Sequence, residues 1–225
     1  MGGRAEEART KRDRIVQELR RRVLTGEYPR GTWLRQDELA LEFKTSITPI
    51  REALRILETE RIAVAEPHKG VRVAGADIDR VEAIYVNRRL VESFAVQRAT
   101  SRMSRRDLAA QQRILERMGI LHGSDAIEVR DLNRAFHFGF YERSGLPELT
   151  TSIAALWDAF PWDLQLQDDQ RLSRSHRDHE DILAAVVAGE AQHAAELMAG
   201  HIASGYAGLR IALIGENGPD PFDEE

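Results

Sequence analysis

Histidines are the side chains of this sequence with the clearest capacity for chemistry. The chain has seven of them and no cysteine, so a bound metal must be held by imidazole nitrogen or by carboxylate or amide oxygen. Asn133 and His137 are spaced one helical turn apart, and His179 and His201 lie in two later segments with helical periodicity. We expect these side chains to converge from three helices on one divalent metal site inside a helical bundle. Imidazole ligands make zinc the simplest choice of metal.

The segments that must position these histidines have helical signals from Asp77 onward. Glycine and serine interrupt the pattern at Gly123–Ser124, Gly145 and Gly189, and Pro161 is expected to kink or divide one helix. The predicted helices cover residues 77–102, 104–121, 125–144, 147–168, 170–188 and 191–213. Six or seven amphipathic helices joined by short connections predict an all-α antiparallel bundle.

The first third of the chain has a different pattern. A short helix over residues 36–43 is followed by the connection Lys44–Thr45–Ser46 and by an amphipathic helix that has Pro49 in its first turn, where no backbone donor is needed. The apolar face of this second helix carries Ile47, Ile50, Leu54 and Leu57. Beyond it, apolar residues alternate around a Pro-His-Lys-Gly turn, which predicts a two-stranded wing. The predicted fold class is therefore mainly α, with a winged helix-turn-helix before the bundle.

Charge is unevenly distributed along the chain. Residues 1–75 hold 16 Lys and Arg against 12 Asp and Glu, a net charge of +4, whereas the remaining residues hold 16 against 25, a net charge of −9. The basic part is the candidate nucleic-acid module. No segment has the roughly 20 consecutive apolar residues that a membrane helix needs, and the N-terminus lacks the apolar stretch of a signal peptide. We expect no membrane contact and a cytoplasmic location.

Residues 12–74 resemble the winged-helix domain of the GntR family of bacterial regulators, and TPIREAL is the specific motif. The resemblance implies that Thr48 and Arg51 face DNA from the recognition helix, that Arg35 lies near the DNA backbone, and that Gly70 marks the tip of the wing. An arginine fork can hold O6 and N7 of guanine, and hydroxyl groups and helix N-termini bind phosphate. The full set of candidate DNA contacts is Arg35, Lys44, Thr45, Ser46, Thr48, Arg51, His68, Lys69 and Gly70.

Three positions depart from the GntR pattern. The family usually has arginine where this chain has Ile47, and glycine where it has Lys44 and Arg61. Ile47 removes a polar contact, and its aliphatic side chain can instead read a thymine methyl group. Lys44 is expected to adopt a positive φ at the turn, and its ammonium group adds a phosphate contact.

The segments LNRAFHFGFYERSG, HEDILAAVVAGE and AAELMAGHI resemble the FCD class of GntR regulators, and the similarity covers about residues 77–213. In that class the helical domain binds a metal and a carboxylate ligand. Its metal pattern is an aspartate, a histidine four residues later, and one histidine from each of two later helices. His137, His179 and His201 match the histidines, whereas Asn133 replaces the aspartate. An amide oxygen can bind a metal but carries no charge.

Arg88 and Glu92 also match an arginine and a glutamate of the FCD class. The resemblance implies that Arg88 is a clamp for the ligand carboxylate, and the alternative is an ordinary ion pair with Glu92 along one helix. Trp157, Phe160 and Trp162 form a cluster of aromatic residues. We expect this cluster to pack in the core, with a lid over the ligand as the alternative.

The sequence predicts four segments: a flexible arm over residues 1–11, a winged helix-turn-helix over 12–75, a helical ligand-sensing and dimerisation domain over 76–213, and an acidic disordered tail over 214–225. The predicted function is a DNA-binding transcription repressor that acts as a homodimer on a palindromic operator and responds to a small carboxylate-bearing metabolite. One alternative is a metal-dependent hydrolase, although the sequence has no convincing base or catalytic motif. Another is a helical scaffold with a degenerate DNA-binding domain.

Overall fold

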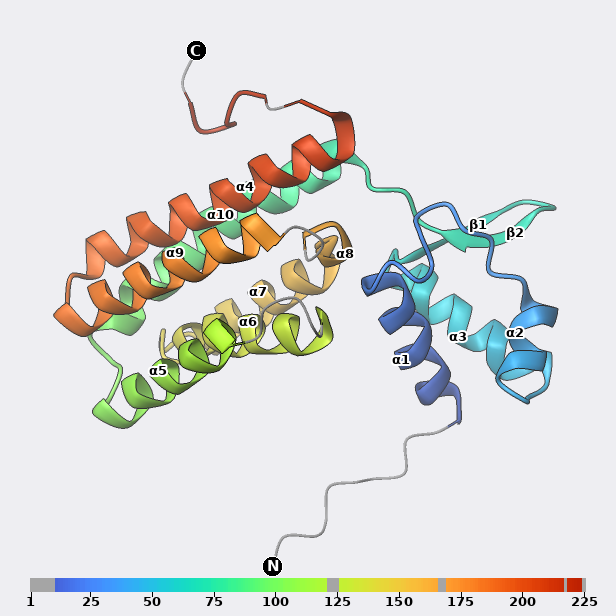
Figure 1. Cartoon of the computed structure of the whole chain (residues 1–225), viewed down its shortest axis with the longest axis horizontal. Helices are drawn as coiled ribbons and strands as arrows, with labels where there is room; N and C mark the ends of the chain where they lie inside the picture. The colour runs from blue at the N-terminus through green and yellow to red at the C-terminus, as the bar shows by residue number, and fades with distance from the viewer. Residues whose placement is uncertain (1–10, 121–125, 166–168, 217, 224–225) are drawn as a thin grey trace, which may run out of the picture. The chain divides into compact units, whose positions relative to one another are not determined.

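The structure is a computed structural model that describes residues 11–120, 126–165, 169–216 and 218–223. The chain divides into two compact units, Met1–Ala76 and Asp77–Glu225 (Figure 1). Most of the expected flexible arm, residues 1–10, lies outside the described residues, and so does the expected helix break at Gly123–Ser124.

The first unit is a winged helix-turn-helix. It contains α1 (Lys11–Leu24), α2 (Gln36–Glu42), α3 (Ile47–Thr59), β1 (Ala63–Glu66) and β2 (Gly70–Val73). The strands pair antiparallel, with Glu66 opposite Gly70. Side chains from the three helices and both strands share one apolar core, which includes Ile15, Leu19, Leu39, Ile50, Leu54, Leu57, Val71 and Val73. Burial of these side chains against one another stabilises the arrangement that presents α3 and the wing.

One residue of the predicted apolar face of α3 lies outside this core. Ile50, Leu54 and Leu57 are buried, but Ile47 is 47% exposed. Ile47 is the first residue of α3, so its side chain projects at the helix end rather than along the face that packs on α1. Ile47 therefore lies outside the buried part of this face, and its aliphatic side chain is available to a partner.

Among the described residues of this unit, three other than glycine have a left-handed backbone. Lys44 has a φ of 48°, Arg61 a φ of 59° and His68 a φ of 63°. This conformation costs an L-residue about 1–2 kcal/mol because Cβ approaches the following carbonyl oxygen. Lys44 has the positive φ expected for it, and Lys44 and Arg61 both stand where the GntR pattern has glycine. The left-handed turns at Lys44 and Arg61 are therefore kept although neither position has the glycine that would adopt them without strain.

The second unit is an antiparallel helical bundle. It is formed by α4 (Ile78–Thr100), α5 (Arg105–Ile120), α6 (Ala126–Tyr141), α7 (Pro147–Ala159), α8 (Trp162–Gln165), α9 (Asp169–Ala188) and α10 (Ala191–Ile214). α10 packs along α4 and α9, while α6 and α7 lie against α4, and α5 contacts both α6 and α9 (Figure 1). The predicted fold class is confirmed.

Local signals set the ends of several bundle helices. Asp77 caps α4 by accepting the backbone N–H of Asp79 at 3.1 Å. Ser104 and Asp107 exchange side-chain and backbone hydrogen bonds at the start of α5, which satisfies two donors that the helix leaves unpaired. Pro161 is expected to kink or divide the fourth predicted helix, and in the structure it separates α7 from α8.

α10 is the one described helix with the length and apolar composition of a membrane-crossing segment, although the sequence analysis expected none. Its apolar side chains have a packing role in the bundle, because Met198, Ile202, Tyr206 and Leu209 are buried and the helix contacts α4 and α9. The core helix of a bundle has the same composition as a membrane helix.

The C-terminal residues differ from the expected disordered tail. Over residues 218–223 the chain folds back onto α4, where Asp220 and Phe222 contact Tyr85 and Arg89. The acidic composition that suggested disorder instead supplies the carboxylate that docks this segment.

Candidate functional site

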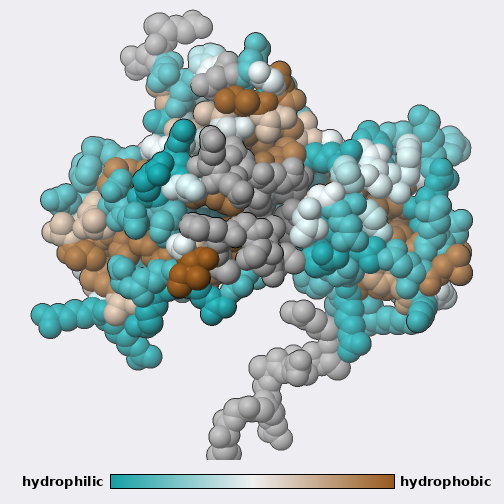
Figure 2. All heavy atoms as spheres, in the orientation of Figure 1, coloured by the Kyte–Doolittle hydropathy of each residue, from teal (hydrophilic) through white to brown (hydrophobic). Residues whose placement is uncertain are grey.

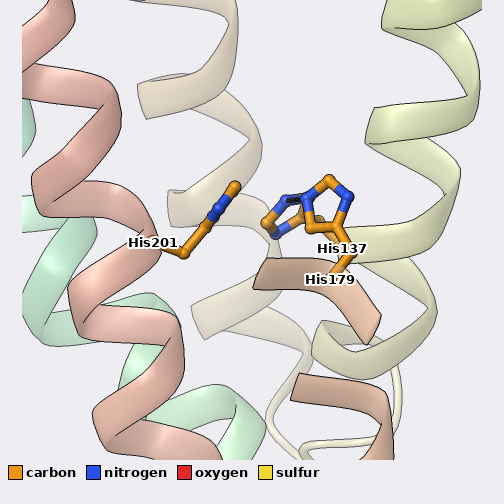
Figure 3. A group of neighbouring side chains, drawn as sticks. All are labelled: His137, His179 and His201. Atoms are coloured by element: carbon orange, nitrogen blue, oxygen red, sulfur yellow. Dashed lines mark hydrogen bonds between the residues drawn. The ribbon is translucent and has the colours of Figure 1, made fainter. Parts of the chain in front are cut away.

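Three histidines from three helices of the bundle face one another. His137 lies on α6, His179 on α9 and His201 on α10, and their rings turn toward a common point (Figure 3). One potential ligand atom from each lies within 4.8 Å of the other two. Nε2 of His137 is 3.1 Å from Nε2 of His179. His137 and His179 are fully buried, and the side chain of His201 is 13% exposed.

A hydrogen-bonded chain fixes the tautomer of His137. The hydroxyl of Tyr141 donates its only proton to the buried carboxylate of Glu92 at 2.5 Å, because a carboxylate can only accept. The Tyr141 oxygen must therefore accept the Nδ1–H of His137 at 2.9 Å. Burial, and then the charge of Glu92, raise the pKa of Tyr141 well above its usual value, so the phenol keeps its proton. The Nε2 lone pair of His137 is left facing the other histidines.

His201 is oriented in a similar way by a different carboxylate. Its Nδ1 lies 3.1 Å from Asp178, so Nδ1–H donates to this carboxylate and Nε2 is the ring nitrogen left for a metal. Metal-binding histidines in proteins usually donate their second ring N–H to a carboxylate, a carbonyl or a water. His179 differs, since its buried Nδ1 has no hydrogen-bond partner among the described residues.

The buried imidazoles are neutral at ordinary pH. Burial lowers the pKa of His137 well below 6.5, with further lowering by His179, His201 and Arg88. Burial, followed by the charges of His201 and His176, likewise lowers the pKa of His179. Neutral imidazoles with directed lone pairs are the donor set that zinc and other borderline transition metals prefer. The residues present therefore fit a divalent metal.

A cavity of about 220 Å³ opens beside the histidines. Its walls include Asn133, His137 and His201, so Asn133 shares the cavity with two of the histidines it was expected to join. His176 also lines the cavity, whereas His193 is 56% exposed and lies near Glu196. The structure thus brings the four predicted metal residues to one region and keeps His193 apart from it.

The position of Arg88 agrees with both roles considered for it from the sequence, a clamp for a ligand and an ion pair with Glu92. It lines the cavity, and it forms a buried ion pair with Glu92, with Nε 2.6 Å from the carboxylate. The Arg88 guanidinium also lies 4.9 Å from the ring centre of Trp157, 4.6 Å from that of Phe160 and 5.1 Å from that of Trp162. The aromatic cluster is thus packed in the core, and two of its members, Phe160 and Trp162, also form part of the cavity wall.

Sequence reasoning did not single out several residues of this site. Tyr141 stands one turn after His137, a spacing that places it on the same face, so helical periodicity could have found it. Asp178 precedes His179 in sequence but hydrogen-bonds to His201, and this pairing requires the packing of α9 on α10. Arg171 brings a second guanidinium to the cavity wall.

In the first unit the candidate DNA contacts lie at the start of α2, in the turn before α3, on α3 and in the wing. All of them are exposed except Thr45, which is half-buried. The N-terminus of α3 has no side-chain cap from Ser46, so the backbone N–H groups of the first turn are available to an anion. Gly70 has a φ of 113° at the end of the wing turn, a conformation that favours glycine.

The basic side chains of this unit divide into two groups. Among the described residues, Arg35 and Arg51 have no carboxylate partner, whereas Lys69 and Arg72 share Glu66 in the wing. Lys69 is 69% exposed in that pair, and such surface pairs are worth only about 0–1 kcal/mol. Among the described residues no carboxylate competes for Arg35 or Arg51, and Lys69 can exchange its partner at little cost.

Comparisons with known proteins agree with this geometry. The model of bacterial regulatory proteins of the gntR family matches residues 11–73, and the FCD domain model matches residues 83–204. The chain is 30% identical to the HTH-type transcriptional regulator McbR of Escherichia coli over 145 residues, which are 64% of this chain and 65% of that protein. The solved structure of E. coli McbR/YncC superimposes with a TM-score of 0.69 at 24% identity and covers 86% of this chain and 94% of that chain.

Another relative matches over a shorter stretch of the chain. The gluconate operon transcriptional repressor of Bacillus subtilis is 39% identical over 85 residues, which are 38% of this chain and 35% of that protein. The chain thus spans about a third of the length of that repressor and just under two thirds of McbR.

Proposed function

Because this chain belongs to the gntR family of bacterial regulatory proteins and carries an FCD domain, we propose that it is a DNA-binding transcription repressor controlled by a small organic acid. The observation that carries the proposal is the convergence of His137, His179 and His201 beside a cavity, in a chain that also has a winged helix-turn-helix. Proteins of this family are transcription regulators rather than enzymes, so the hydrolase alternative has no support. A regulator of chromosomal genes works in the bacterial cytoplasm.

The DNA-reading surface is formed by the nine candidate contacts at the start of α2, in the turn, on α3 and in the wing. Arg51 reads guanine. Phosphates are held by Arg35, Lys44, Thr45, Ser46 and Thr48. The wing reaches the DNA through His68, Lys69 and Gly70. The exposure of Ile47 supports contact with a thymine methyl group. The two unpaired arginines argue against a degenerate DNA-binding domain.

A homodimer follows from the size of this surface, because one short recognition helix contacts too few base pairs for useful specificity. Two copies related by a twofold axis would read a palindromic operator. Leu90 and Phe94 lie one turn apart on α4 and are 56% and 46% exposed. On the face drawn in Figure 2, hydrophobic side chains gather in patches on a largely hydrophilic surface. Exposed apolar residues of this kind support association through the bundle. A monomer by light scattering, both free and on DNA, would contradict the dimer.

The sensor is the cavity with its histidines. His137, His179 and His201 would hold a divalent metal, with zinc as the simplest choice, and Asn133 would add an amide oxygen. The bound metal supplies positive charge that an anionic ligand can neutralise. Three imidazoles and one amide bring no negative charge to a metal, so its charge would not be balanced by these ligands. Arg88 keeps donor groups beyond those used by Glu92 and serves as a second anchor for a carboxylate.

The ligand can act on DNA binding only through a difference in affinity for two arrangements of the protein. Release of the operator on ligand binding is the outcome expected of a repressor. The direct test is an anisotropy titration of a DNA duplex from the region upstream of the chain's own gene. It is carried out with metal-loaded protein, with chelated protein, and with the double variant His179→Ala/His201→Ala.

The test separates sequence-specific DNA binding from control of that binding by a metal. Sequence-specific binding that changes on chelation supports a DNA-binding regulator under metal control, and elemental analysis should then find metal in the parent chain but not in the double variant. Binding that is specific but unaffected by chelation and by the double variant contradicts metal control. Absence of specific binding to any genomic fragment in a selection experiment contradicts the regulator itself.

A further inference from the structure

The C-terminal segment, residues 218–223, is held on the bundle by one carboxylate and one aromatic ring. Asp220 accepts hydrogen bonds from the Tyr85 hydroxyl at 2.8 Å and from Arg89 at 2.6 Å. Arg89 also donates to the Tyr85 oxygen at 2.7 Å. The Phe222 ring centre lies 4.2 Å from Cζ of Arg89, and the ring meets Tyr85 edge-on at 6.0 Å. Two side chains of the segment therefore bind the same two residues of α4.

Tyr85 belongs to the wall of the ligand cavity as well as to this contact. Its ring stacks on the ring of Tyr206 from α10, with the centres 4.1 Å apart and the planes at 4°. Both tyrosines line the cavity, and they are only 1% and 3% exposed. The segment holds the hydroxyl end of Tyr85, so it forms the outer layer of this part of the wall.

The other half of the wall is tied to the segment through Arg210. Tyr206 donates to Glu82 at 2.6 Å and accepts from Arg210 at 3.2 Å. Gly218 passes so close to Arg210 that an added Cβ would collide with the guanidinium. The chain thus crosses Arg210 at Gly218 and reaches Arg89 at Asp220, next to both tyrosines.

We propose that residues 218–223 are a strap that holds the Tyr85–Tyr206 wall of the cavity closed, and that small molecules pass when Asp220 releases Tyr85 and Arg89. Arg89 and Asp220 are each 25% exposed, whereas the Arg88–Glu92 pair one residue away is buried. A partly exposed ion pair opens more easily than a buried one, because water can replace the partner. The passage of a ligand rests on the proposed function; the closing of the cavity by the strap does not.

The first test measures access to the cavity without any ligand. Trp162 lines the cavity, and a Trp33→Phe background removes the tryptophan of the first unit. In that background, Asp220→Ala should raise the rate of acrylamide quenching about tenfold, the change expected when a charge-assisted contact worth roughly 1.4 kcal/mol is lost. A chain ending at Glu216 should behave in the same way. Asp223→Ala is the matched control, since it removes the same charge from the same segment without removing a side-chain contact with Tyr85 or Arg89.

The second test measures passage of the metal alone. The parent, Asp220→Ala and Asp223→Ala are loaded with Co²⁺, and removal of the ion by EDTA is followed by absorption. Removal should be about tenfold faster from Asp220→Ala than from the other two, for the same loss of one contact.

The outcomes distinguish the strap from the metal centre. Equal quenching in the parent, Asp220→Ala and the shortened chain, all with the same helical circular dichroism, would overturn the strap. Faster quenching together with an absence of Co²⁺ absorption in every chain would support the strap and contradict the metal centre. Faster quenching in Asp223→Ala as well would show an effect of charge alone, which also overturns the proposal.

Discussion

His137 and His179 direct their Nε2 atoms at each other across 3.1 Å, although they come from different helices. The Nδ1 proton of His137 is donated to Tyr141, so its Nε2 offers a lone pair to the shared space. Without a metal, one of the two nitrogens must carry a proton between them. A divalent cation can replace that proton, because it accepts both lone pairs at once.

Replacing Tyr141 by Phe should weaken metal binding by about 10–100-fold, the usual effect of losing a partner that orients a metal ligand. The substitution removes the acceptor that holds the Nδ1 proton of His137 and leaves the ring free to turn. Metal affinity is measured by competition with a fluorescent chelator. Tyr28→Phe is the matched control, since it removes a hydroxyl from the other unit. Equal affinities in the two variants would mean that Tyr141 has no orienting role.

The stability of the metal-free chain should depend on pH through the buried histidines. The pKa values of His137 and His179 are lowered by burial and then by neighbouring charges, so the folded chain keeps both rings neutral. The unfolded chain takes up protons on them as the pH falls through about 6.5. The stabilising contribution of the neutral rings is therefore present above that pH. Below it, the free energy of unfolding falls by about 1.4 kcal/mol per pH unit for each histidine.

This pH dependence is measured by urea unfolding in the presence of a chelator. His179→Gln should reduce the slope, and His193→Gln, at a position whose side chain is 56% exposed, should leave it unchanged. A parent chain whose stability does not fall on acidification would show that these histidines are not buried as neutral groups.

The helices and the histidine cluster were predictable from the sequence because both depend on local periodicity. Spacing of one turn places Asn133 and His137 on one face, and three amphipathic helices in a small bundle have few ways to bury their faces. Tertiary pairing was not predictable in this way. Asp178 adjoins His179 yet serves His201, and this depends on how α9 packs along α10.

Two features of the chain do not follow from local patterns. Ile47 fits the apolar periodicity of α3 but is 47% exposed. Periodicity shows which face of a helix is apolar, but not which end of the helix extends past the core of the unit. The segment after α10 has the composition of a disordered tail, but long-range contacts of Asp220 and Phe222 with Tyr85 and Arg89 hold it on the bundle. Composition is an average over a whole segment, so it does not reveal the contacts that individual side chains make.

Arg61→Gly should stabilise the first unit. The residue has a φ of 59° directly after α3, where an L-side chain is strained by about 1–2 kcal/mol and glycine is not. The greater freedom of glycine in the unfolded chain offsets about 0.4–1 kcal/mol of this, so a net gain of up to about 1.6 kcal/mol is expected. Urea unfolding followed by Trp33 fluorescence measures it. Arg55→Gly removes the same charge inside α3 and should destabilise the unit by about 1 kcal/mol. A loss of stability in both variants would contradict the strain at Arg61.

Arg51 and Lys69 should affect DNA binding in different ways. Arg51 is exposed on α3 and has no carboxylate partner among the described residues, so its fork is free to hold one guanine. Arg51→Ala should cost about 1–3 kcal/mol on the best operator and relax the preference at one base pair. Lys69 lies 3.3 Å from Glu66 in the wing and is expected to contact phosphate. Lys69→Ala should weaken all sequences alike and lower the slope of log affinity against log salt by about 1.

Both variants are measured by anisotropy on a set of single-base operator variants at several salt concentrations. The comparison is informative because each variant removes one positive charge, so a general electrostatic loss appears in both. If Arg51→Ala changed only the salt slope and kept the base preference, Arg51 would be a phosphate contact. The reading of bases would then belong to the first turn of α3, where Ile47 and Thr48 are both exposed.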